Sequence, residues 1–154
     1  MELIEVTSYV LHSLFAGIWT GSVLLMAIAV LPLAKDGTLN AAPLAAITGT
    51  LTTVSRASAL VLFLTGSHMA AARYTSESLT GTDGGYLVLS MLALWFLLAA
   101  TVEIGASKLR DGTERDKVRE PAREAWSFFL AAAVLASLLL VTAGLLSANN
   151  VGFL

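Results

Sequence analysis

Two histidines are the residues of this sequence best suited to chemistry, and they lie in neighbouring apolar stretches. His12 is early in residues 6–33, and His68 is late in residues 51–72. If both stretches cross a membrane as helices, they run in opposite directions. At 1.5 Å per residue, His12 then lies about 9 Å and His68 about 7.5 Å below the same membrane face. Two imidazoles at matched depth are suitable ligands for a haem iron or a metal ion.

Other side chains at this depth extend the candidate site. Met91 lies about 7.5 Å into a third apolar stretch, residues 86–104, and its thioether suits a soft metal ion. A methionine in an apolar helix more often serves packing. Helical periodicity groups further residues with these three, and they are Ala16 and Trp19 near His12, Thr65 near His68, and Trp95 near Met91.

We expect Trp19 to form a floor beneath His12, and Ala16 to leave room for a flat ligand such as haem b. Arg73 is the cation available to haem propionates near this face of the membrane. A membrane histidine can also simply hydrogen-bond a neighbouring helix. However, ionisable groups in spans are costly and are functional candidates by default. The sequence has no cysteine, which excludes thiolate metal sites, iron–sulfur clusters and covalent c-type haem.

The composition indicates an integral membrane protein. The chain has 154 residues, of which 56% are hydrophobic and only 13% are charged, whereas soluble domains usually carry about 25% charged residues. Four stretches approach or exceed the roughly 20 apolar residues that span a bilayer. They predict one all-α domain, an antiparallel four-helix bundle with spans at about 6–33, 51–72, 86–104 and 126–147.

The basic residues predict how the bundle faces. Eight of the nine lie on one side of a four-span topology, and they are Lys35, Arg56, Lys108, Arg110, Arg115, Lys117, Arg119 and Arg123; the ninth is Arg73. Because basic residues collect in cytoplasmic loops, we expect a multi-pass plasma-membrane protein with both termini extracytoplasmic. The net charge of −2 gives no reason to expect nucleic-acid binding.

Three further sequence patterns predict local packing or helix ends. Gly17 and Gly21 form a GxxxG motif, which predicts close helix packing, either within the bundle or to a second copy of the chain. Glu103 and Arg56 lie near the same membrane face, where mutual neutralisation is favoured over a proton relay. Thr113 and Asp116 have the spacing of a capping box that would start a helical extension into the fourth span.

The first two spans resemble a known membrane family. His12 is followed by Trp19, Gly21 and Leu31-Pro32, and the second span contains Thr65-Gly66-Ser67-His68. These motifs resemble the CopD-like copper-resistance membrane proteins and the related membrane protoporphyrinogen oxidases of the HemJ type. The resemblance implies a helical membrane protein that handles copper or haem b. Both groups often have a lysine in the next span, where this chain has Leu89-Ser90-Met91, and this difference disfavours the oxidase.

Haem binding between His12 and His68 is narrowly the favoured function, with electron transfer between a membrane donor and an extracytoplasmic acceptor. This makes a redox carrier or transporter more plausible than an enzyme. Copper binding or transport through His12, His68 and Met91 is the first alternative. A HemJ-type oxidase and a structural subunit of a membrane complex are the others. The expected partners are the lipid bilayer, a redox protein, and a second copy through Gly17 and Gly21.

Overall fold

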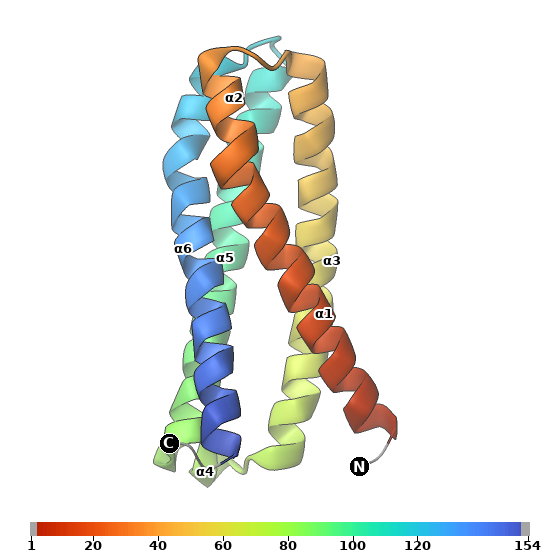
Figure 1. The fold of residues 1–154 in the computed structure, drawn as a ribbon, viewed down its shortest axis with the longest axis vertical. Coiled ribbons are helices and arrows are strands. Elements are labelled where there is room, and N and C mark those ends of the chain that lie inside the picture. Colours follow the sequence, from red (N-terminus) through yellow and green to blue (C-terminus); the bar gives the residue numbers. More distant parts are fainter. Residues whose placement is uncertain (1–2, 152–154) are drawn as a thin grey trace.

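The structure, a computed structural model, describes residues 3–151. The first rod consists of α1 (Leu3–Leu25), the π-helical turn η1 (Met26–Val30) and α2 (Leu31–Asp36). The other three rods are α3 (Ala41–Arg73), α5 (Asp83–Thr113) and α6 (Arg119–Asn150), and the short α4 (Ser76–Gly81) joins α3 to α5. Successive rods run in opposite directions (Figure 1). The predicted all-α four-helix bundle is therefore confirmed.

All four rods are long and apolar enough to cross a membrane, with 34, 33, 31 and 32 residues. Rods of this length extend about 50 Å, beyond the roughly 30 Å of a hydrocarbon core. The helices thus exceed the predicted spans, because charged and hydroxyl residues continue each helix beyond its apolar part. The capping-box prediction was wrong, since Thr113 ends α5 and Asp116 has a φ of 57° in the following turn.

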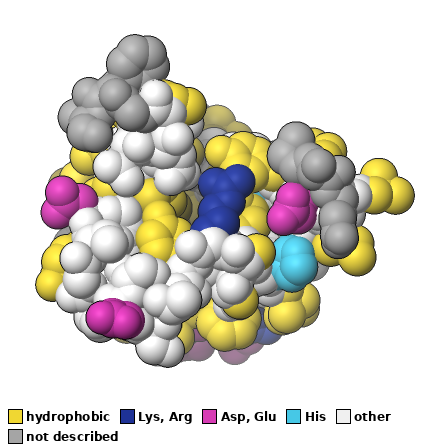
Figure 2. Space-filling view, turned by 90° about the horizontal axis from the view of Figure 1, so that it is seen from below, with side chains coloured by type: hydrophobic (Ala, Val, Ile, Leu, Met, Phe, Trp, Pro, Cys, Tyr) yellow, Lys and Arg dark blue, Asp and Glu magenta, His cyan; other side chains and the backbone are white. Residues whose placement is uncertain are grey.

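We name the two ends of the bundle by what they carry. The terminal end contains the first residues of α1 and α5 and the last residues of α3 and α6. The basic end contains the connections 37–40 and 114–118. Figure 2 views the terminal end, where a mainly uncharged surface surrounds a basic side chain near the centre.

Pro32 accounts for the irregular turn in the first rod. Proline has no backbone N–H, and its ring clashes with the carbonyl four residues earlier in a regular α-helix. The chain widens just before it, so the N–H of Leu31 donates to the carbonyl oxygen of Met26. In Figure 1 the part of the rod before this turn crosses the bundle diagonally.

Two glycines allow α5 and α6 to pack closely. A β-carbon at Gly112 would collide with the ring of Pro121, and one at Gly105 would lie 2.8 Å from the ring of Phe129. Both glycines are buried. Because neither has a side chain, the two helix backbones can approach each other at the basic end.

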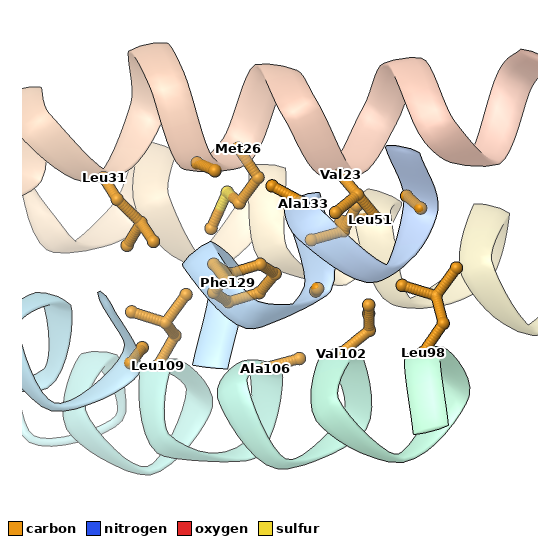
Figure 3. Close-up of a cluster of buried hydrophobic side chains, with 14 of the residues drawn as sticks. Val23, Met26, Leu31, Leu51, Leu98, Val102, Ala106, Leu109, Phe129 and Ala133 are labelled. Atoms are coloured by element: carbon orange, nitrogen blue, oxygen red, sulfur yellow. The ribbon is translucent and has the colours of Figure 1, made fainter. Parts of the chain in front are cut away.

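The packed core occupies only the basic half of the bundle. Figure 3 shows side chains from all four rods meeting around Phe129, which is fully buried. Among the described residues, buried side chains begin at Trp19 in α1 and at Leu98 in α5, and they end at Leu62 in α3 and at Ala136 in α6. The terminal half of the bundle is therefore packed differently.

Candidate functional site

A cavity of about 410 Å³ replaces the packed core in the terminal half of the bundle. Trp19, Leu62 and Leu98, which end the core, also line the cavity and form its floor. The mouth lies at the terminal end, where the lining residues include Tyr9, Arg73, Tyr74 and Asn150. All four rods contribute, and most of the lining side chains are apolar. The volume is within the range of small-molecule and cofactor sites.

His12 is the histidine that lines this cavity. Its Nδ1 nitrogen lies 2.8 Å from Oγ1 of Thr65 on α3. The Thr65 hydroxyl already donates its proton to the carbonyl oxygen of Val61, 2.7 Å away. Oγ1 must therefore accept the bond from His12, which places the ring proton on Nδ1. In the neutral imidazole this leaves the lone pair of Nε2 available to a metal ion or a hydrogen-bond donor.

Gly66 provides the space that the His12 ring occupies. A β-carbon built at Gly66 would lie 3.1 Å from Cε1 of His12, which is tighter than an ordinary contact. Thr65 therefore orients the imidazole, and Gly66 allows it to pack closely on α3. This arrangement of Thr65 behind the ring resembles the outer hydrogen bonds that fix metal-binding histidines.

The structure does not bring His68 to the cavity. The cavity face of α3 carries Gly66, Met69, Ala70 and Arg73, which are spaced as one side of a helix. His68 is exposed and lies about 100° around the helix from Met69. Depth along a helix is readable from sequence, but matched depth does not fix the rotation of each helix. In addition, the described residues contain no group of three His, Cys, Asp or Glu side chains that could hold a metal ion.

The other predicted site residues lie mostly in the cavity wall. Ala16, Trp19, Met91 and Trp95 all line the cavity, whereas Thr65 lies behind His12. Trp19 donates from Nε1 to Oγ of Ser55 at 2.7 Å, and both residues are buried, so this part of the floor is fixed. Trp95 packs against Phe63 and Phe96, with ring centroids 5.5 and 4.7 Å apart.

Arg73 lies at the cavity mouth. Its guanidinium carbon is 5.9 Å from the ring centroid of Tyr9, a distance at which a cation is attracted to an aromatic face. This contact connects the last turn of α3 to the first turns of α1. A positive charge at the mouth favours a ligand whose anionic group points towards the terminal end.

The sequence did not reveal the wall supplied by α6. The last helix contributes a set of mainly apolar or small side chains, Leu139, Leu140, Ala143, Leu146, Ser147 and Asn150. Ala143 and Ser147 are one helical turn apart, and small residues at that spacing are a signal of a recess. The signal is weak because the same spacing also serves helix packing.

Two sequence predictions concern residues away from the cavity. Arg56 on α3 forms the expected ion pair with Glu103 on α5, and Arg110 also contacts this carboxylate at 3.2 Å. Gly17 and Gly21 are exposed, and a β-carbon at either would meet no atom within 4 Å. The GxxxG motif therefore does not pack within the bundle, and its use between two copies of the chain stays a prediction.

Comparison of the chain with protein-family models, with curated proteins and with solved structures found no match. The resemblance to CopD-like and HemJ-type proteins stays a prediction from the short motifs in the first two spans.

Proposed function

We propose that this chain is an integral plasma-membrane protein that holds haem b in the cavity and transfers electrons at the extracytoplasmic face. His12 is the proposed axial ligand. The observation that carries the proposal is the 2.8 Å hydrogen bond between Nδ1 of His12 and Oγ1 of Thr65. Because the Thr65 hydroxyl donates to Val61, we infer that Nδ1 carries the ring proton and that Nε2 keeps its lone pair. A histidine held in this way, next to a mainly apolar cavity, suits a haem iron.

The proposed orientation follows from the charges at the two ends. The basic end carries Lys35 and the cluster from Lys108 to Arg123, so it would face the cytoplasm. The terminal end, with the cavity mouth and both ends of the described chain, would then be extracytoplasmic. A cofactor at this depth can exchange electrons with a protein outside the membrane.

The residues of the cavity fit haem better than a bare metal ion. A volume of about 410 Å³ far exceeds the needs of one ion. A copper ion needs several donors that converge on one point, and among the described residues His12, Met69 and Met91 offer an imidazole nitrogen or a thioether sulfur in this lining. Haem instead requires apolar walls for its ring and a cation near its propionates, which Arg73 supplies.

Two of the residues predicted from the sequence, Met91 and His68, are candidates to hold the iron together with His12. Met91 lines the cavity, and His–Met ligation is found in cytochromes. His68 was favoured by its depth but lies off the cavity face, so the ligation of haem by both histidines would require α3 to rotate. We therefore place Met91 ahead of His68.

The protein residues would bind and tune the cofactor, and haem would supply reversible one-electron chemistry. Thr65 would orient His12 and, by accepting a hydrogen bond from Nδ1–H, raise the basicity of Nε2. Trp19 and Leu62 would close the floor against water from the basic half. Arg73 would pair with a carboxylate at the mouth.

Copper binding by His12 and Met91 is the second candidate, because these soft-metal donors and Met69 line one cavity. Detergent-purified protein would be titrated separately with haemin and with Cu(I), and binding measured by absorption and by metal analysis. The proposal predicts one haem per chain and loss of binding in His12→Ala. Stoichiometric Cu(I) binding without haem binding would contradict it and favour the second candidate.

A further inference from the structure

The four rods form two pairs that are linked differently. Within the first pair, α1 is connected to α3 by the His12–Thr65 bond at 2.8 Å and the Trp19–Ser55 bond at 2.7 Å. Within the second pair, α5 packs tightly on α6 through Gly105 and Gly112. We call α1, η1, α2 and α3 the first hairpin, and α5 with α6 the second hairpin.

Polar links between the two hairpins lie towards the basic end in the described part of the chain. Arg56 pairs with Glu103, and Arg110 donates to Oγ1 of Thr52 at 3.1 Å. On the other side of the bundle, Lys35 lies 4.0 Å from the ring centroid of Trp126. Arg119 also donates to the carbonyl oxygen of Asp36 at 3.2 Å. These contacts fix the hairpins to each other where the core is also packed.

In the terminal half the cavity separates the same two hairpins. The buried side chains end at the cavity floor. Beyond it the two hairpins meet through the aromatic pair Phe63 and Trp95, and at the terminal end through Tyr74, whose hydroxyl lies against Gly84 of α5. At the terminal end the connection 74–82 joins α3 to α5, whereas no connection within residues 3–151 joins α1 to α6. In Figure 1 the first turns of α1 diverge from α6. The terminal halves of α1 and α6 are therefore the parts of the two hairpins with the fewest contacts to hold them together.

We infer that the two hairpins move relative to each other about the packed basic half, which we call the hinge block. The terminal halves of the hairpins approach each other when a ligand fills the cavity. Closure would bury the ligand against side chains of both hairpins and would recover packing that the open cavity lacks. The π-helical turn before Pro32 lies at the boundary between the hinge block and the moving part of α1. The inference requires a ligand in the cavity but does not depend on its being haem.

The absence of cysteine allows a direct test with pairs of spin labels. One pair, Leu14→Cys with Val141→Cys, reports on the terminal halves of α1 and α6. The matched pair, Leu33→Cys with Leu130→Cys, reports on the hinge block, and all four side chains are exposed. Distances would be measured by double electron–electron resonance in lipid nanodiscs, with and without haemin, and haemin binding would be checked by absorption in the same samples.

The inference predicts a broad distance distribution for the terminal pair without haemin, which narrows and moves to shorter distances when haemin binds. The hinge-block pair should be narrow and unchanged. Bound haemin with no change in the terminal pair would overturn the inference. If haemin does not bind, the proposed function fails, and the distance distributions measured without haemin then test the inference alone. A broader distribution for the terminal pair than for the hinge-block pair supports movement of the terminal halves, and equal widths refute it.

Discussion

Nδ1 of His12 on α1 lies 2.8 Å from Oγ1 of Thr65 on α3, and this hydroxyl donates in turn to the carbonyl oxygen of Val61. The chain of bonds fixes the imidazole tautomer and directs the free lone pair to Nε2. It also connects the first two rods beside the cavity. The candidate site is therefore organised around a histidine whose orientation is set by a neighbouring helix.

Thr65→Val should weaken haem binding without abolishing it. The substitution keeps the side-chain shape but removes the acceptor for Nδ1–H, and loss of such outer-shell bonds typically lowers metal affinity about 10- to 100-fold. Haemin titration of the purified variant measures the change. Thr53→Val is the matched control, because Thr53 is exposed and bonds its own helix. Equal affinity in Thr65→Val and the parent protein would show that this bond does not orient the ligand.

Gly66→Ala should displace the imidazole of His12. The new methyl group would lie 3.1 Å from Cε1, so the ring has to move away from α3. Haem affinity should fall although alanine favours a helix by about 0.5–1 kcal/mol relative to glycine. Gly144→Ala is the control, since a β-carbon there meets nothing within 4 Å. If both variants bound haemin as the parent does, the position of the His12 ring against Gly66 would not matter for haem binding.

Trp19→Phe should lower the thermal stability of the bundle. The indole of Trp19 is buried and donates to Ser55, and losing one partner of a buried hydrogen bond costs about 1–3 kcal/mol. Thermal unfolding in detergent, followed by circular dichroism, measures the loss. Trp126→Phe, at the basic end and partly exposed, should have the smaller effect.

Glu103→Gln should loosen the hinge block, because Arg56 and Arg110 share this carboxylate. Spin labels at Leu33→Cys and Leu130→Cys should then give a broader distance distribution. Glu124→Gln is the control, since its ion pair with Lys108 lies within the second hairpin. If the two variants gave the same distribution, the link between the hairpins would not depend on Glu103.

The sequence predicted the fold more completely than the site. Long apolar stretches and a one-sided distribution of basic residues are enough to predict four antiparallel helices. The depth of His12 was also readable, because each residue adds about 1.5 Å to a helix. The direction in which His68 points could not be predicted from the sequence, since the rotation of α3 about its axis depends on which of its side chains pack against α1 and α5. The hydroxyls of Thr65 and Ser55 became informative only when their partners on α1 were known.

Haem binding through His12 is tested most directly by the reduced-minus-oxidised absorption spectrum of the detergent-purified protein after loading with haemin. The parent protein should show the sharp bands of a b-type haem held by two protein side chains. His12→Ala should lose these bands, Met91→Leu should alter them, and His68→Ala should leave them unchanged. An unchanged spectrum in His12→Ala, or the absence of haem bands from the parent, would contradict the central claim that His12 holds a haem in this cavity.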